Sequence, residues 1–126
     1  MTGLASIFER DRYVVLHSLL KEPTLGQFYR HARNKARLGG MDSGDDQVPG
    51  TPCAYGDLMM DGLLNALLAE IEAASGLKLF PTYSYFRIYK NGDRLARHVD
   101  RPSCEISVTL CLGFEGVESW PSRLPD

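Results

Sequence analysis

The stretch that decides the fold is TYSYFRIYKNG, residues 82–92. Its side chains follow a period of two, which is the period of a β-strand. Two sets of residues share the two faces: Tyr83, Tyr85, Arg87 and Tyr89 alternate with Thr82, Ser84, Phe86 and Ile88. The Asn91-Gly92 pair that follows is a strong signal for a tight turn. The stretch therefore predicts a strand over 82–89 that ends in a turn.

The same period returns downstream, over residues 105–112. Apolar side chains alternate there with small or polar ones: Ile106, Val108, Leu110 and Leu112 lie between Glu105, Ser107, Thr109 and Cys111. This pattern predicts a second, half-buried strand. Its small, polar face leaves volume beside the sheet, which a barrel that holds a ligand requires. A shorter run of apolar and β-branched residues, 13–16, predicts one more strand near the N-terminus.

Two helices are predicted upstream of residue 82. The first begins at Pro23, carries apolar residues at helical spacing and ends at Gly39-Gly40. The second is capped by Asp57, carries an apolar stripe and ends at Gly76. Between them, residues 39–56 are rich in glycine, proline and aspartate, a composition that predicts a long loop.

Helices come first and antiparallel strands afterwards, an order that indicates the α+β class, with N-terminal helices packed on an antiparallel sheet. A chain of 126 residues is long enough for one domain. We therefore expect a single domain over 1–126. Its first part, 1–78, is a helical support region that contains the loop 39–56, and its second part, 79–126, supplies the strands.

Composition excludes several classes of function. The 14 basic and 16 acidic side chains give a net charge of −2, which disfavours binding to a nucleic-acid backbone. Apolar runs are too short to span a membrane, and the charged stretch 9–12 interrupts any signal peptide. Three cysteines, at 53, 104 and 111, form no paired framework. These features predict reduced thiols and a cytoplasmic location.

The strongest chemical motif is His98-Val99-Asp100. On an extended segment, residues two apart point to the same face, so the imidazole and the carboxylate converge on one point. They would form two thirds of the set of two histidines and one carboxylate that holds non-haem ferrous iron. An ordinary ion pair at the surface is the alternative explanation of so short a motif.

The run from Pro81 to Glu105 resembles the iron(II)/2-oxoglutarate-dependent dioxygenases, and most closely their prolyl-4-hydroxylase-like branch. The shared features are a strand that ends in tyrosine, a turn with glycine, a leucine, the HxD motif and an alternating strand. The resemblance implies a double-stranded β-helix, or jelly roll, of which residues 79–126 would form a part.

Roles for individual residues follow from this resemblance. It implies that His98 and Asp100 are iron ligands and that Tyr89 lines the pocket for 2-oxoglutarate. Cys111 lies on the following strand, where relatives often carry another pocket residue, frequently a tyrosine; a small buried core residue is the alternative for Cys111. The implied cofactors are Fe(II), the co-substrate 2-oxoglutarate and ascorbate, and the implied reaction is hydroxylation of a C–H bond. The substrate is either a small molecule or a peptidyl residue.

The resemblance also implies a second histidine and a basic residue on strands well beyond the HxD motif. No histidine follows Asp100 in this sequence. We therefore expect an incomplete barrel that binds iron weakly, shows no turnover, and pairs with a second copy through its open sheet edge. Two alternatives remain open: a truncated relative that acts as a non-catalytic interaction module, and a small α+β binding domain in which His98 and Asp100 form an ion pair.

Overall fold

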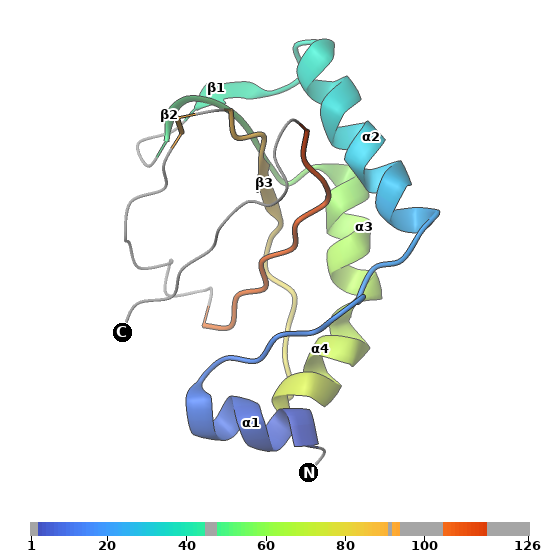
Figure 1. Ribbon diagram of the computed structural model, residues 1–126, viewed down its shortest axis with the longest axis vertical. Coiled ribbons are helices and arrows are strands. Elements are labelled where there is room, and N and C mark those ends of the chain that lie inside the picture. The colour runs from blue at the N-terminus through green and yellow to red at the C-terminus, as the bar shows by residue number, and fades with distance from the viewer. Residues whose placement is uncertain (1–2, 45–47, 91, 94–104, 116–126) are drawn as a thin grey trace. The chain divides into compact units, whose positions relative to one another are not determined.

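The computed structural model of the protein describes residues 3–44, 48–90, 92–93 and 105–115 (Figure 1). The chain divides into two compact units: residues 1–21 with 55–85, and residues 22–54 with 86–126. Seven elements follow one another along the described residues: α1 (Gly3–Asp11), α2 (Thr24–Arg37), β1 (Asp42–Gly44), β2 (Pro49–Tyr55), α3 (Leu58–Ala66), α4 (Leu68–Ser75) and β3 (Tyr85–Arg87). The prediction of the α+β class is confirmed.

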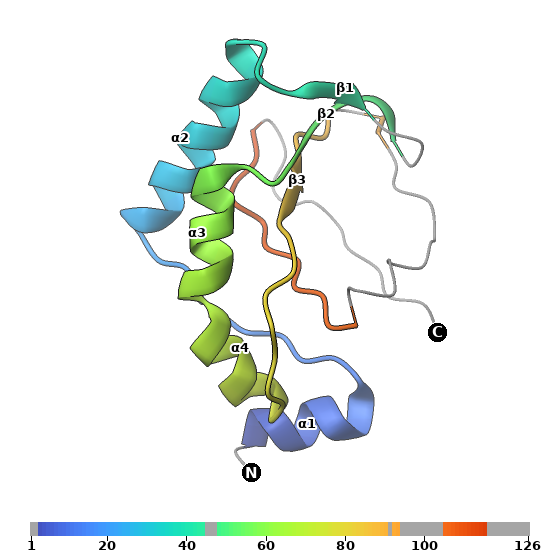
Figure 2. The same cartoon turned by 180° about the vertical axis from the view of Figure 1, so that it is seen from behind.

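The first unit is built around the packing of α1 against α4. Figures 1 and 2 show α1 lying across the end of α4 where that helix finishes. The buried residues of the two helices are small: Ala5 is 1% exposed and Ala74 is 5% exposed. Small side chains let two helix backbones approach closely. No helix or strand was predicted over residues 3–11, so α1 is a finding of the structure.

The helix predicted after Asp57 forms as two segments, α3 and α4, which are separated at Leu67. Hydrogen bonds continue across this point, from the Leu67 N–H to the Leu63 carbonyl at 3.0 Å and from the Ile71 N–H to the Leu67 carbonyl at 3.1 Å. Gly76 ends α4 with a φ of 74°, a conformation that glycine adopts without strain. The predicted start and end of this helical region are both confirmed.

Asp57 stabilises the first turn of α3. Its carboxylate accepts a hydrogen bond from the Met60 N–H at 3.1 Å, and the residue is only 6% exposed. We expect Asp57→Ala to lower the free energy of unfolding by about 1 kcal/mol, because the Met60 N–H loses its acceptor. Urea unfolding followed by circular dichroism measures this change. Asp57→Ser keeps an oxygen acceptor and should cost much less; equal losses in both variants would contradict the role of the cap.

The chain that leaves α4 runs back beside α4 and α3 towards β3 (Figure 2). The Leu79 N–H donates to a Glu72 carboxylate oxygen at 2.9 Å, and the Ser84 hydroxyl donates to Asp61 at 2.5 Å. Side chains of the helices therefore hold part of the segment that was predicted as a strand over 82–89. The strand itself is shorter and covers Tyr85–Arg87.

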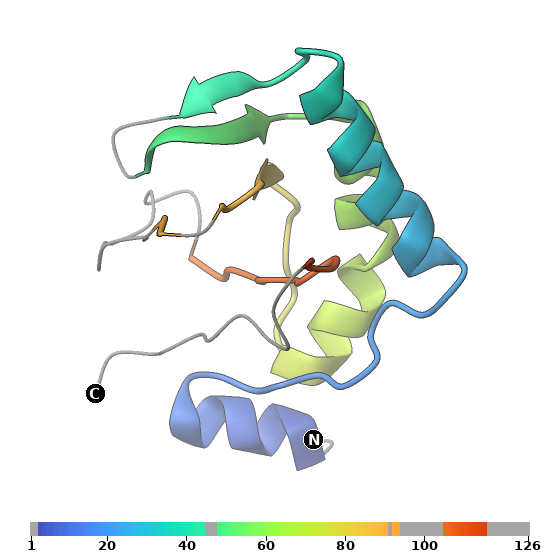
Figure 3. The ribbon, with the colours of Figure 1, turned by 45° about the horizontal axis from the view of Figure 1, so that its top comes forward.

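The three strands form an open sheet in the order β1-β2-β3. The Gly56 N–H donates to Ser84, and the Ile88 N–H donates to Pro52, which is the register of an antiparallel pair. β1 and β2 form a hairpin, seen from above in Figure 3. Gly44 has a φ of 112°, and a Cβ atom there would lie 2.3 Å from the Gly50 nitrogen, so the hairpin requires glycine.

The prediction that residues 39–56 form a loop is wrong, because this range contains both β1 and β2. Glycine and proline suggested a loop, yet both suit this hairpin. Pro49 is the first residue of β2, a position where proline is tolerated. Pro52 has no N–H to donate, but its carbonyl accepts the hydrogen bond from Ile88 at 2.9 Å. Pairing with two neighbours outweighs the low strand propensity of the sequence.

Two further predicted strands are wrong, because residues 13–16 and 105–112 form none. Residues 113–115, which follow the second of these ranges, contact α2: Arg33 forms an ion pair with Glu115 at 2.8 Å, and the Tyr29 hydroxyl donates to Glu115 at 3.1 Å. Gly113 lies so close to the Tyr29 ring that a Cβ atom there would be 2.8 Å from a ring carbon.

Buried apolar residues in the described part of the chain are few and mostly small: Ala5, Ala32, Val48, Cys53, Ala54, Met60 and Ala74. Large apolar side chains are exposed instead, with Leu58 at 89% and Phe80 at 82%. Taken over the described residues, no helix has both the length and the apolar character that crossing a bilayer demands.

Candidate functional site

The predicted turn after β3 is present. The Asp93 N–H donates to the Lys90 carbonyl at 2.9 Å, which closes a four-residue turn. Gly92 occupies the third position of this turn with a φ of 92°. A positive φ at this position favours glycine, so the Asn91-Gly92 signal in the sequence has a direct structural cause. This turn is the last described element before the HxD motif.

Three residues, Thr51, Lys90 and Asp93, fix the turn to β2; we call them the Asp93 cluster. The Asp93 carboxylate accepts hydrogen bonds from the Thr51 hydroxyl at 2.5 Å, from the Lys90 backbone N–H at 2.9 Å and from the Lys90 ammonium at 3.0 Å. The ammonium also reaches the Gly50 carbonyl at 3.3 Å. All members belong to the second unit. The cluster therefore anchors the turn through both oxygens of its carboxylate.

Burial differs sharply within the Asp93 cluster. Thr51 is completely buried, the Asp93 side chain is 11% exposed, and the Lys90 side chain is 61% exposed. The Thr51 hydroxyl is thus sealed from water and depends on Asp93 as its acceptor. Lys90 shields the outer side of the carboxylate and remains in solvent, where its ion pair contributes little by itself.

These hydrogen bonds lower the pKa of Asp93 to about 2, with the bond from Thr51 as the largest cause and the bond from the Lys90 backbone next. A carboxylate whose folded pKa lies below its unfolded value stabilises the fold above the unfolded pKa, near 4. That stabilisation is lost as the pH falls from about 4 towards 2, because the unfolded chain then binds a proton more readily than the folded one.

We expect this loss to appear in a comparison of the wild-type chain with Asp93→Asn. The wild-type chain should be the more stable above pH 5, and the difference should shrink as the pH is lowered towards 2. Urea midpoints measured at intervals between pH 7 and pH 2 test the prediction. A difference that stays constant over this range would show that the charge of Asp93 does not stabilise the fold.

Of the four predicted site residues, two lie outside the described residues. These are His98 and Asp100, the expected metal ligands, so their convergence stays a prediction. Tyr89 is described and half-buried, and it directly precedes Lys90 of the Asp93 cluster. Cys111 is exposed, with its sulfur 3.9 Å from the Gly113 carbonyl oxygen. The prediction that both residues bind 2-oxoglutarate stays untested, whereas the alternative that Cys111 is a small buried core residue is wrong.

The described residues alone do not fit an iron ion. Within 3–44, 48–90, 92–93 and 105–115, no three histidine, cysteine, aspartate or glutamate side chains gather as a metal site would require. Thr51 and Asp93 were not among the predicted site residues. The position of Asp93, directly after the Asn91-Gly92 turn, was a signal in the sequence that could have identified it. Thr51 lies in the range 39–56, which was predicted as a loop.

Comparisons with known proteins leave the family open: no family model, no curated protein and no solved structure matches this chain.

Proposed function

We propose that this protein is an iron(II)- and 2-oxoglutarate-dependent oxygenase of the hydroxylase type. In this proposal His98 and Asp100 bind iron, while Tyr89 and Cys111 belong to the pocket for 2-oxoglutarate. The observation that carries it is the anchored turn after β3, since the HxD motif follows a strand and a glycine turn in the resemblance as well. The Asp93 cluster joins that turn to the buried Thr51 at 2.5 Å. The turn that precedes the motif in the sequence is therefore anchored to β2.

The proposal also covers the fold, the location, the cofactors and the substrate. Residues 79–126, which include β3, would be part of a jelly roll in a cytoplasmic protein. The cofactors would be Fe(II), 2-oxoglutarate and ascorbate, and the substrate would be a small molecule or a peptidyl residue. Since no second histidine follows Asp100 in the sequence, the 126-residue chain should bind iron weakly and release no succinate.

Anaerobic calorimetry tests the proposal directly. 2-Oxoglutarate is titrated into the 126-residue chain with and without Fe(II), and again into His98→Ala and Tyr89→Phe. We expect binding that requires Fe(II), disappears in His98→Ala and weakens in Tyr89→Phe. The same two changes made in the first unit, His17→Ala and Tyr13→Phe, serve as matched controls and should leave binding unchanged. Binding that does not require Fe(II), or that survives in His98→Ala, would refute the proposal.

A second candidate function is a non-catalytic interaction module, in which His98 and Asp100 bind no metal. Exposed apolar side chains favour it: Leu58 is 89% exposed and Phe80 is 82% exposed, both in the first unit. Large exposed apolar surface marks interaction sites. The open three-stranded sheet adds a pairing edge for a second copy. A Co(II) titration separates the candidates: binding that depends on both His98 and Asp100 supports the oxygenase, whereas a folded chain that binds no Co(II) supports the module.

A further inference from the structure

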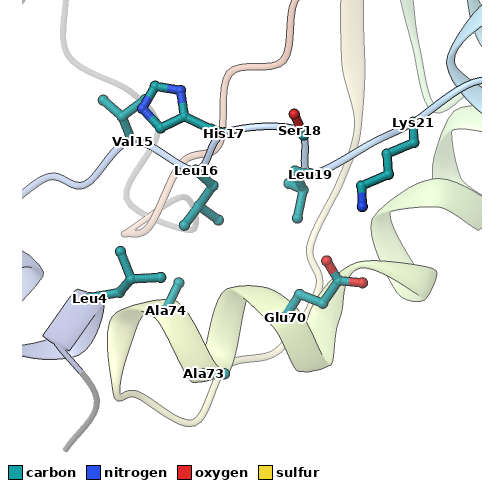
Figure 4. A pocket seen from close by; sticks show the side chains of 10 residues that line it. All are labelled: Leu4, Val15, Leu16, His17, Ser18, Leu19, Lys21, Glu70, Ala73 and Ala74. Carbon is teal, nitrogen blue, oxygen red and sulfur yellow. The ribbon is translucent and has the colours of Figure 1, made fainter.

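A groove of about 650 Å³ lies within the first unit (Figure 4). Three segments line it: α1 through Leu4, the connection 15–21, and α4 through Glu70, Ala73 and Ala74. Figure 4 shows Leu16 and Leu19 pointing towards α4, with Leu4 reaching into the same space. Its volume falls in the range of about 300–1,000 Å³ that is typical of small-molecule sites. The groove thus offers apolar walls to a ligand.

Two side chains of opposite charge, Lys21 and Glu70, also line the groove. In Figure 4 the Lys21 ammonium and the Glu70 carboxylate point towards one another across the groove. Their side chains form no ion pair with each other, and neither side chain has a hydrogen bond or ion pair with another residue in the part of the chain that is described. His17, by contrast, is turned away from α4 in Figure 4. A cationic and an anionic group therefore face each other with space between them.

We propose that this groove binds a free α-amino acid with a bulky apolar or aromatic side chain. Its carboxylate would pair with Lys21 and its ammonium with Glu70, while its side chain would lie against Leu16 and Leu19. Charge complementarity supports this occupant, since a zwitterion presents both charges from a single carbon atom. Charge-assisted hydrogen bonds are the stronger kind, and burial of the side chain adds a favourable apolar contribution.

Other small molecules satisfy the groove less well. A simple fatty or aromatic acid would pair with Lys21 and leave Glu70 without a partner. An amine would do the reverse. The interior of a peptide carries neither charge. A free amino acid satisfies both groups and the apolar wall together. This inference is independent of the proposed oxygenase function, because its residues all belong to the first unit, whereas Tyr89 and Cys111 belong to the second.

Calorimetric or NMR titration of the 126-residue chain with L-phenylalanine tests the inference. N-acetyl-L-phenylalanine lacks the ammonium, and L-phenylalaninamide lacks the carboxylate. We expect each analogue to bind about tenfold or more weakly than L-phenylalanine, because each loses one charge-assisted pair. Glycine, which keeps both charges and lacks the side chain, should bind more weakly still.

Protein variants assign the two charges. We expect Lys21→Gln and Glu70→Gln each to weaken L-phenylalanine about tenfold or more. Lys21→Gln should bind L-phenylalanine and L-phenylalaninamide equally, because the partner of the carboxylate is gone. Glu70→Gln should bind L-phenylalanine and N-acetyl-L-phenylalanine equally, because the partner of the ammonium is gone. Lys78→Gln and Glu9→Gln replace exposed charges outside the groove and serve as matched controls. Absence of L-phenylalanine binding, equal binding of all three ligands to the wild-type chain, or equal losses in the controls would overturn the inference.

Discussion

His98→Ala and Asp100→Ala should each abolish measurable binding of Co(II), a spectroscopic substitute for Fe(II), to the 126-residue chain. The wild-type chain should bind one Co(II) weakly, since the sequence offers two ligands in this motif and water fills the other positions. Loss of an outer-shell partner alone costs about 10- to 100-fold in metal affinity. Loss of one of only two protein ligands should lower the affinity for Co(II) further, so that the already weak binding can no longer be detected.

The visible absorption of Co(II) during titration measures this effect. His17→Ala is the matched control, because it removes a histidine that lies outside the motif. 2-Oxoglutarate should tighten Co(II) binding to the wild-type chain, since a ligand that binds the metal shifts the equilibrium by linkage. It should leave His98→Ala unchanged. Co(II) binding that persists in both motif variants, or that is lost in His17→Ala, would show that His98 and Asp100 are not metal ligands.

Thr51→Val should lower the free energy of unfolding by about 1–3 kcal/mol. Threonine and valine have nearly the same shape, so the substitution removes the hydroxyl and leaves the packing in place. The hydroxyl is completely buried and donates to Asp93 at 2.5 Å. The variant should also raise the pKa of Asp93 towards its ordinary value, because the bond from Thr51 is the largest cause of the lowered pKa.

Urea unfolding and an NMR titration of Asp93 measure these two changes. Thr109→Val is the matched control, since Thr109 is exposed and should respond weakly. A double-mutant cycle with Asp93→Ala isolates the pair: Thr51→Val should cost markedly less when Asp93 is already absent. Additive costs in the double variant, or an unchanged pKa of Asp93, would show that Thr51 does not stabilise the turn through this carboxylate.

Local signals in the sequence predicted several features correctly. The cap at Asp57, the helix end at Gly76 and the turn at Gly92 each depend on a few neighbouring residues. A side-chain acceptor satisfies a nearby N–H in the first case, and glycine permits a positive φ in the other two. The helix Thr24–Arg37 likewise follows from apolar spacing within its own length. The α+β class follows from the order of these elements.

Strand positions required the tertiary structure. An alternating pattern forms a strand only where another strand supplies hydrogen bonds, and residues 105–112 form no strand although they alternate. Directly after them, Glu115 binds Tyr29 and Arg33 of α2. Conversely, the glycine- and proline-rich range 39–56 became β1 and β2 because partners exist on both sides of β2. Period two describes the direction of side chains and carries no information about the neighbour.

By itself, the sequence predicted the helix over 24–37, the start and end of the helical region between Asp57 and Gly76, and the glycine turn, since each is encoded within a few consecutive residues. Only the tertiary structure decided that Thr51 and Asp93, which are 42 positions apart, share a buried hydrogen bond. It also decided that Lys21 and Glu70 face one another across a groove. Contacts between residues far apart in the sequence depend on how helices and strands pack in the folded chain, and no pattern of neighbouring residues specifies that packing.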